Sequence, residues 1–185
     1  MSKKKSFLRQ FWQEKKMVGA MAPSSRFLAQ KMLKDIDFAS ARVIVELGPG
    51  TGVFTDKIVE LMHPDAILLV FELNDHFMDQ LRNRYSDPRV RLIHDSAEKI
   101  QEYLDKEGLK HADVVVSSLP LANFPKELRD SILSAADDAL VENGHYVQFQ
   151  YSLQSKKQIQ KTFRKTQIRF TPLNFPPAFV YACRK

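Results

Sequence analysis

Val43-Ile44-Val45-Glu46-Leu47-Gly48-Pro49-Gly50-Thr51-Gly52 is the stretch of this sequence that decides the fold. It begins with an apolar run and ends in a loop that has glycine at three alternate positions. A short apolar run bounded by glycine is typical of a strand buried on both faces. Glycines after such a strand permit positive φ and let a ligand approach the backbone. The stretch therefore predicts a buried strand, a ligand-binding turn and a helix that begins near Val53.

The glycine spacing excludes two common nucleotide motifs. The dinucleotide fingerprint G-x-G-x-x-G needs its third glycine three residues after the second, whereas Gly52 follows Gly50 by two. A phosphate-binding P-loop ends in Gly-Lys-Ser/Thr, and here Gly52 is followed by Val53 and Phe54. A simple strand–helix turn does not need three glycines, since each spare one costs conformational entropy. The loop is therefore expected to bind a ligand of another kind.

Further along the chain, apolar strands alternate with helices. Strands are predicted at 43–45, 67–71, 90–93, 114–116, 146–149, 166–171 and 178–183. Helices are predicted at about 53–61, 74–84, 97–106, 126–140 and 155–163. Continuously apolar strands separated by helices indicate a parallel sheet covered on both faces. Because no helix separates the last two strands, they should form an antiparallel hairpin. We expect an α/β, Rossmann-like, seven-stranded sheet, mostly parallel with an antiparallel last strand, plus N-terminal helices.

Two acidic residues stand at strand ends, as a nucleotide site requires. Glu72 closes the second strand, 26 residues after Glu46, where α/β folds place a carboxylate for ribose hydroxyls. Asp95 closes the third strand. Taken alone, Asp95 is more typical of a helix N-cap. In series with Glu46 and Glu72, each at the carboxyl end of a strand, a ligand contact is favoured.

The pattern E-x-G-x-G-x-G resembles motif I of S-adenosylmethionine (SAM) methyltransferases, whose class I architecture matches the expected sheet. The resemblance implies SAM as cofactor, S-adenosylhomocysteine as product, and a cofactor-binding domain over 41–185. It also implies that Asp95 accepts a hydrogen bond from the adenine amino group. The implied cofactor-binding residues are Ser25, Glu46, Gly48, Gly50, Thr51, Gly52, Phe54, Thr55, Glu72, Leu73, Asp95, Ser96, Ala97 and Ser118.

The loop after the fourth strand, Ser117–Pro125, is where amine-directed methyltransferases meet the methyl acceptor. Adenine methyltransferases of this kind carry Asn or Asp, then Pro-Pro and an aromatic residue, so that a side-chain carbonyl holds the amine and a ring stacks on the base. Here Ser118 replaces Asn or Asp, and Leu121 replaces the aromatic residue. The loop is therefore poorly suited to a flipped adenine, unless Asn123 or Phe124 does the same work.

Three segments give the chain a closer resemblance to bacterial phospholipid N-methyltransferases: Met17–Leu28, Ser118–Leu121 and Asn174–Ala178, together with the glycine loop. This resemblance implies N-methylation of a phosphatidylethanolamine-like head group at a membrane surface. The backbone carbonyls of Ser118 and Leu119 would accept from the amine, and Tyr151, His94 or water would take its proton. The expected substrate-binding residues, for cofactor carboxylate or lipid phosphate, are Ser24, Arg26, Arg164 and Lys165.

The charge distribution agrees with an anionic partner. The net charge of +6 combines +5 over residues 1–17, −7 over 18–142 and +8 over 143–185. Residues 3–17 predict an amphipathic helix with Phe and Trp on one side and Lys and Arg around it, as in interfacial helices. We assign residues 1–40 to N-terminal amphipathic and lid helices of a single globular domain. An anionic membrane surface is the expected partner, and packing of this helix on the domain is the alternative.

The remaining composition bounds the location and the chemistry. A single cysteine, Cys183, and the lack of a signal peptide or of an apolar run of membrane-spanning length indicate a cytoplasmic protein. The resemblance to phospholipid N-methyltransferases and the basic N-terminal helix imply that it associates peripherally with the inner face of the membrane. The five histidines are dispersed, so no metal is expected. Two alternatives stay open: a ribosomal RNA adenine N6-methyltransferase, although that class carries a further helical domain not expected here, and a non-catalytic SAM-binding membrane module.

Overall fold

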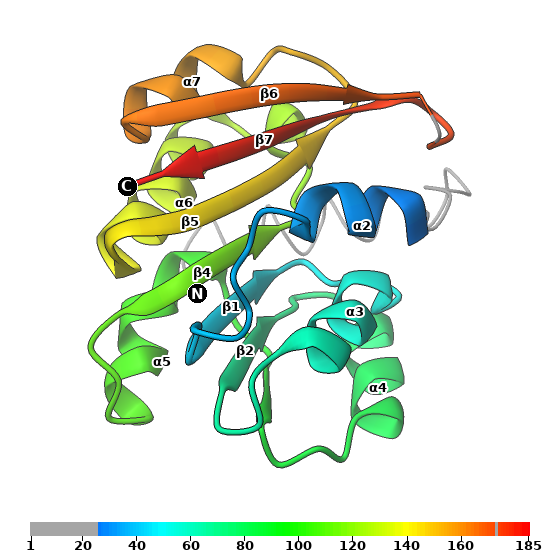
Figure 1. Ribbon diagram of the computed structural model, residues 1–185, viewed down its shortest axis with the longest axis vertical. Coiled ribbons are helices and arrows are strands. Elements are labelled where there is room, and N and C mark those ends of the chain that lie inside the picture. The colour runs from blue at the N-terminus through cyan, green and yellow to red at the C-terminus, as the bar shows by residue number, and fades with distance from the viewer. Residues whose placement is uncertain (1–25, 173) are drawn as a thin grey trace.

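The computed structural model describes residues 26–172 and 174–185 (Figure 1). Its strands are β1 (Val43–Leu47), β2 (Ile67–Phe71), β3 (Val90–Ile93), β4 (Ala112–Ser117), β5 (Leu140–Gln150), β6 (Lys165–Thr171) and β7 (Ala178–Arg184). Its helices are α2 (Arg26–Leu33), α3 (Val53–Leu61), α4 (Asp75–Arg84), α5 (Ile100–Lys106), α6 (Lys126–Ala139) and α7 (Lys156–Thr162). Two 3-10 turns are η1 (Ala97–Lys99) and η2 (Leu121–Asn123). The helix expected over 3–17 lies outside the described residues.

All seven strands join one sheet in the order β3-β2-β1-β4-β5-β7-β6. β1 to β5 pair in parallel, and β7 pairs antiparallel with β5 on one side and β6 on the other. The predicted fold class is therefore confirmed, including the single reversed strand. The strand order changes direction between β1 and β4, and open α/β sheets bind ligands at that point, beyond the carboxyl ends of the strands.

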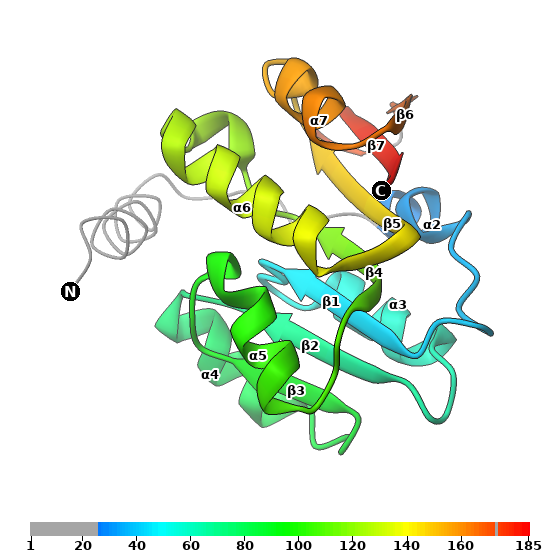
Figure 2. The same cartoon turned by 90° about the vertical axis from the view of Figure 1, so that its left-hand side faces the viewer.

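Helices cover both faces of the sheet (Figure 2). Residues of α2, α3 and α4 pack with Ile44 and Leu68 in one buried cluster. Residues of α5, α6 and α7 pack with Val43 and Val45 in the other. Because successive strand residues point to opposite faces, β1 must be apolar at every position except where it carries the site. Glu46 is that exception.

Helix α2 belongs to the same core as the sheet. Leu28, Met32 and Leu33 are at most 3% exposed, and they pack in the cluster that holds Ile44 of β1. The part of the chain described before residue 41 thus shares one hydrophobic core with the part after it. No helix among the described residues has both the length and the apolar character that crossing a bilayer requires.

Candidate active site

The glycine loop leaves β1 at the edge where the parallel strands end. Gly48 and Gly50 have φ of 69° and 56°, which a residue with a Cβ adopts only at a cost. A Cβ at Gly48 would lie 2.6 Å from Cδ2 of Leu119, so glycine also permits the β4 loop to approach. The backbone N–H of Gly48 donates to the carbonyl of Phe71 at 2.9 Å. The loop is therefore fixed between the ends of β2 and β4.

Glu72 connects the end of β2 to this loop. Glu72 is 2% exposed, and its carboxylate accepts hydrogen bonds from the N–H of Gly50 at 3.2 Å and of Asn74 at 2.8 Å. Burial raises the pKa of Glu72, and the backbone N–H donors of Asn74 and Gly50 oppose that shift. Glu72 thus holds the loop in place and keeps acceptor capacity at the sheet edge.

Glu46 lies under the loop, between the sheet and α3. One carboxylate oxygen, Oε2, accepts from the hydroxyl of Thr55 at 2.7 Å. The other, Oε1, is buried and has no hydrogen-bond partner. Burial raises the pKa of Glu46 to about 8, the Thr55 hydroxyl opposes this, and the charge of Glu72 adds to it. A buried unpaired carboxylate oxygen is costly, and a donor from a ligand would satisfy it.

Asp95 serves the turn that follows β3. Its carboxylate accepts from the N–H of Ser96 at 2.8 Å, from the hydroxyl of Tyr103 at 3.3 Å and from Nζ of Lys99 at 2.9 Å. Ser96 in turn caps η1 by accepting from the N–H of Glu98 at 3.3 Å. Ser96 rather than Asp95 is thus the N-cap of this turn, and the contact of Asp95 with adenine stays a prediction.

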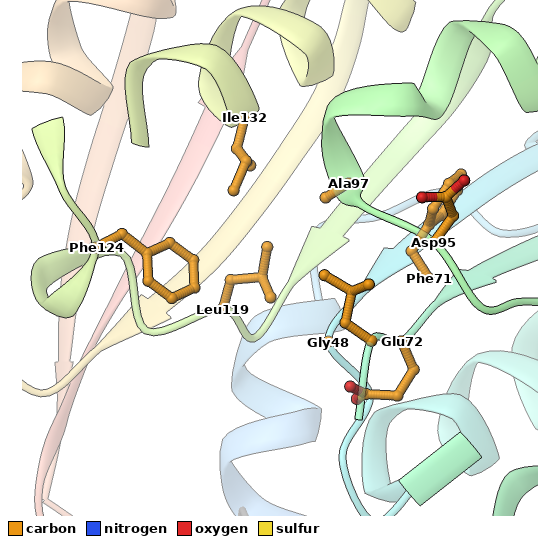
Figure 3. A pocket seen from close by; sticks show the side chains of 9 residues that line it. Gly48, Phe71, Glu72, Asp95, Ala97, Leu119, Phe124 and Ile132 are labelled. Carbon is orange, nitrogen blue, oxygen red and sulfur yellow. The ribbon is translucent and has the colours of Figure 1, made fainter. Parts of the chain in front are cut away.

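A cavity of about 310 Å³, part of which is open to solvent, lies at this edge of the sheet (Figure 3). Figure 3 shows the carboxylates of Glu72 and Asp95 on one side of it and apolar side chains from the β4–α6 segment on the other. The lining residues are Gly48, Phe71, Glu72, Leu73, Asp95, Ala97, Leu119, Phe124 and Ile132. Residues from the ends of four strands (β1, β2, β3 and β4) and from α6, far apart in the sequence, thus converge on one space.

The structure brings most of the predicted cofactor residues to this cavity or directly beneath it. Five line it: Gly48, Glu72, Leu73, Asp95 and Ala97. Others are placed in the loop (Gly50, Thr51, Gly52), under it (Glu46, Thr55) or beside it (Ser96, Ser118). Phe54 does not face the cavity. It is 1% exposed and its ring stacks on Phe149 with a centroid distance of 5.8 Å, so Phe54 packs in the core, and the ligand contact predicted for it stays a prediction.

The acceptor loop corrects one prediction about backbone carbonyls. The carbonyl of Leu119 accepts from the N–H of Leu121 at 2.8 Å and from Nε2 of both Gln148 and Gln150 at 2.9 Å. A carbonyl oxygen has two lone pairs, so three donors leave it no capacity for a substrate amine. The contact predicted for this carbonyl is therefore wrong, and Leu119 contributes its side chain instead. The hydroxyl of Ser118, by contrast, is buried without a partner.

Gln148 and Gln150, which are not among the residues expected from the sequence, position the acceptor loop. Both are buried in β5, and their amide oxygens accept from the hydroxyl of Tyr146 at 2.7 Å and from the N–H of Ala122 at 3.3 Å, respectively. The signal was present, because two glutamines two positions apart in a buried strand share one face and must find polar partners. Their partner, the Leu119 carbonyl, fixes the acceptor loop.

Tyr151 does not have the environment of a general base. It follows β5, where its ring contacts Phe149 at 5.5 Å, and it hydrogen-bonds the Asn174 side chain. Burial raises the pKa of the Tyr151 hydroxyl, which disfavours the phenolate that a base would use. The catalytic role predicted for Tyr151 is therefore at odds with the structure. His94 lies near the cavity edge, with Nε2 3.2 Å from the carbonyl of Leu73.

The predicted phosphate-binding cations are not brought to this site. In the sheet, Lys165 of β6 is level with Arg184 of β7, and Arg184 is level with His145 of β5. His145 lies near the start of the section of β5 that pairs with β4, whereas the cavity lies beyond the end of that section. Arg164 and Lys165 are therefore at the opposite ends of the strands from the cavity. Arg164 is 3.5 Å from Glu142 there. Ser24 and Ser25 lie outside the described residues, as does the side chain of Arg26, which begins α2. The phosphate contact predicted for Arg164 and Lys165 is wrong for this cavity.

The chemistry of the site fits a nucleoside with a cationic amino-acid tail, which is the composition of SAM. The unpaired oxygen of Glu46 and the carboxylate of Glu72 offer acceptors for ammonium and hydroxyl donors. Phe71 and Ala97 offer an apolar surface for a base. Within the described segments, no three His, Cys, Asp or Glu side chains gather as metal ligands do.

Comparisons with known proteins agree with this geometry. The family model of ribosomal RNA adenine dimethylase matches residues 13–168. Ornithine lipid N-methyltransferase of Singulisphaera acidiphila is 32% identical over 180 residues, which cover 96% of this chain and 94% of that protein. Ribosomal RNA small subunit methyltransferase A of Thermotoga petrophila is 26% identical over 57% of this chain and 38% of that protein.

A solved structure supports the same fold. Precorrin-6y C5,15-methyltransferase of Geobacter metallireducens superimposes with a TM-score of 0.68 at 15% identity, covering 86% of this chain and 89% of that one. The structure and the sequence match thus indicate the same family. The structural features that do so are the glycine loop, the carboxylates at the strand ends and the strand order of the sheet. The chain belongs to the ribosomal RNA adenine dimethylase family and is a SAM-dependent methyltransferase of the class I fold.

Proposed function

We propose that this protein transfers a methyl group from SAM to the amine of a lipid head group, either phosphatidylethanolamine or an ornithine lipid, at the inner membrane surface. The observation that carries the proposal is the composition of the acceptor side of the cavity. Leu119, Phe124 and Ile132 line it, and the backbone carbonyl of Leu119 already accepts from Nε2 of Gln148 and of Gln150.

Such a wall suits a small aliphatic amine better than a nucleobase. A flipped adenine is held by hydrogen bonds to its polar edge and by stacking on a ring. Ser118 has a hydroxyl where adenine methyltransferases of this kind carry a side-chain carbonyl, and Asn123 is exposed and outside the cavity lining. A primary amine on a flexible head group needs only one or two acceptors, and the hydroxyl of Ser118, next to the lining residue Leu119 in the sequence, is buried and has no partner in the protein.

The similarity to ornithine lipid N-methyltransferase supports the same class of acceptor. It extends over 96% of this chain, so it includes the acceptor loop and the β5–β7 segment as well as the cofactor motifs. The motif I glycines alone would not discriminate between acceptors, because methyltransferases of many kinds share them.

The mechanism that follows is orientation of two partners rather than covalent catalysis by the protein. When bound, SAM supplies an electrophilic methyl group on a sulfonium. Glu72 and Asp95 orient the nucleoside, and Glu46 receives a donor under the glycine loop. Gln148 and Gln150 hold the Leu119 carbonyl, so the loop that meets the amine stays at one distance from Gly48. The amine must lose its proton before attack, and His94 or water accepts it.

A second candidate is N6-methylation of adenine in ribosomal RNA. The family model that matches the chain favours it, and so does Phe124, whose side chain lines the cavity where a base would stack. A third is SAM binding without transfer.

One experiment separates these candidates. The purified full-length protein is given radiolabelled SAM together with vesicles containing phosphatidylethanolamine, vesicles containing ornithine lipid, or unmodified ribosomal RNA. Glu72→Ala serves as the control for contaminating activity. Label in either lipid supports the proposal, and the ratio of the two rates identifies the head group. Label in RNA alone would refute it, and cofactor binding without label in any acceptor would indicate the non-catalytic module.

A further inference from the structure

Exposed apolar side chains gather at the edge of the sheet that carries the cavity. Five large apolar residues are exposed within the described part of the chain: Phe27, Leu61, Leu153, Phe170 and Phe175. Three of them follow β5 or flank the β6–β7 turn, namely Leu153 at 45%, Phe170 at 53% and Phe175 at 87% exposure. Single exposed apolar residues are ordinary, but several at one edge mark an interaction surface.

Strand register places these residues level with the acceptor loop. Ser117 of β4 pairs with Gln148 of β5, and Gln150, two positions further, pairs with Phe179 of β7. Phe179 pairs with Phe170 of β6. Phe170 therefore lies at the level that the chain reaches just after β4 ends. Figure 1 shows the tip of the β6–β7 hairpin projecting at the edge toward which β1, β4 and β5 point.

The hairpin tip is built to present its aromatic rings outward. Asn174 is 4% exposed, its Nδ2 donates to the carbonyl of Pro176 at 2.8 Å, and its side chain hydrogen-bonds Tyr151. Phe175 follows this anchored residue directly. The ring of Phe170 packs on Phe179 at a centroid distance of 5.3 Å, which fixes its position while leaving half of it exposed. The apolar surface is thus held in place by buried polar contacts.

Basic residues lie beside these apolar ones. Lys156 and Lys157 are exposed at the start of α7, and the N–H of Lys156 donates to the carbonyl of Leu153 at 3.0 Å. No acidic residue follows Glu142 in the sequence, so this part of the chain carries no opposing charge of its own. Exposed aromatic side chains beside lysines are the composition of surfaces that bind anionic bilayers.

We propose that Leu153, Phe170 and Phe175, with Lys156 and Lys157, form a rim that seats the cavity edge on an anionic lipid bilayer. This inference rests on the proposed lipid substrate for its purpose, but the contact itself needs no methyl transfer. The rim brings the open side of the acceptor loop to the depth of the head groups. A lipid amine then reaches Ser118 without leaving the membrane.

Vesicle binding tests the rim separately from catalysis. The full-length protein is sedimented with phosphatidylcholine–phosphatidylglycerol vesicles, which contain no primary amine, in the absence of SAM. Lys156→Gln with Lys157→Gln removes two charges at the rim, and Arg164→Gln with Lys165→Gln removes two at the opposite edge. The first pair should weaken binding about 30-fold, since each basic residue near an anionic surface contributes about 1 kcal/mol, and the second should have a much smaller effect.

The apolar part of the rim is tested by a matched pair of substitutions. Phe170→Ser with Phe175→Ser should weaken vesicle binding at least about tenfold, whereas Leu61→Ser, at the end of α3 far from the rim, should leave it unchanged. Thermal unfolding of each variant checks that the fold persists. Transfer to a water-soluble, short-chain amine lipid should survive in the rim variants, because that acceptor needs no bilayer.

The outcomes separate the rim from the proposed function. Vesicle binding that is unchanged in both rim variants, or lost equally in the opposite-edge controls, would overturn the inference. A wild-type protein that does not bind vesicles but binds ribosomal RNA, with RNA binding lost in the rim variants, would also overturn the inference. The rim would then be a nucleic-acid surface. Rim-dependent vesicle binding without label in any lipid would support the rim and refute the proposed function.

Discussion

Replacing Gly48 by alanine tests whether Leu119 is a fixed boundary of the cavity, and Gly50→Ala is its matched control. Both glycines have positive φ, at 69° and 56°, so alanine at either position should cost about 1–2 kcal/mol of unfolding free energy. A Cβ at Gly48 also lies 2.6 Å from Cδ2 and 3.3 Å from Cγ of Leu119, whereas one at Gly50 meets no atom within 4 Å. Overpacking of this kind adds about 1–3 kcal/mol.

The expected losses are therefore about 1–2 kcal/mol for Gly50→Ala and about 2–5 kcal/mol for Gly48→Ala. Urea unfolding of the cofactor-free protein measures both, with equal slopes required for the comparison. In the background of Leu119→Ala, which lacks the overlapping side chain, Gly48→Ala should cost no more than Gly50→Ala does, measured relative to Leu119→Ala alone. Equal losses in the two single variants would refute the reasoning and show that Leu119 turns aside freely.

Three further predictions concern individual side chains. Burial raises the folded-state pKa of Glu46 to about 8 from 4.5, so the free energy of unfolding should fall by about 1.4 kcal/mol per pH unit as pH rises through that interval. In Glu46→Gln, the free energy of unfolding measured in urea should lose this pH dependence between about pH 5.5 and about pH 8. An unchanged dependence on pH would contradict the assignment. Gln150→Leu leaves the N–H of Ala122 without its acceptor and the Leu119 carbonyl with one donor fewer. Because this loosens the acceptor loop and not the cofactor site, kcat in steady-state kinetics should fall at least about tenfold, while calorimetry should show unchanged affinity for SAM. Asp95→Ala should raise the dissociation constant of SAM about 10- to 100-fold in calorimetry, the value of one or two hydrogen bonds to a charged group, and unchanged affinity would exclude the adenine contact.

The sheet could be predicted from sequence because each of its signals is local. The strands Ile67–Phe71 and Val90–Ile93 are wholly or mostly apolar runs between polar or turn-forming residues, and their bounds are those expected. β5 is longer than expected, since its first residues, among them Glu142 and Asn143, are polar and exposed and give no apolar signal. The glycine stretch after Val45 indicated the first strand–turn–helix unit, and the alternation of apolar strands with helices along the rest of the chain extended it to the whole sheet.

The cavity could be predicted only where a residue's position follows from the end of its own strand. Gly48, Glu72 and Asp95 all follow parallel strands, so their convergence needs no knowledge of distant contacts. The state of the Leu119 carbonyl depends on Gln148 and Gln150, which lie 29 and 31 residues later in the chain. No local pattern reports that two amides donate to one oxygen.

The errors about Arg164 and Lys165 have a topological cause. Their basic character suggested an anion contact, but β6 runs parallel to β5 and so begins at the edge remote from the cavity. Charge in a sequence identifies a class of partner, whereas the strand order decides which edge the charge occupies. The two lysines at the start of α7 carry the same charge to the opposite edge.

The position of β7 between β5 and β6 also constrains how the protein is made. β6 leaves the ribosome before β7, yet its hydrogen-bonded neighbour in the sheet is β7 alone. The β3-β2-β1-β4-β5 section can assemble during synthesis, because each of its strands finds a partner already made or soon to follow. β6 cannot join the sheet, and one edge of β5 stays unpaired, until β7 has emerged and inserted between β5 and β6. A nascent chain stalled between the two would therefore expose an unpaired strand edge, which is where chaperone binding or aggregation of this protein would begin.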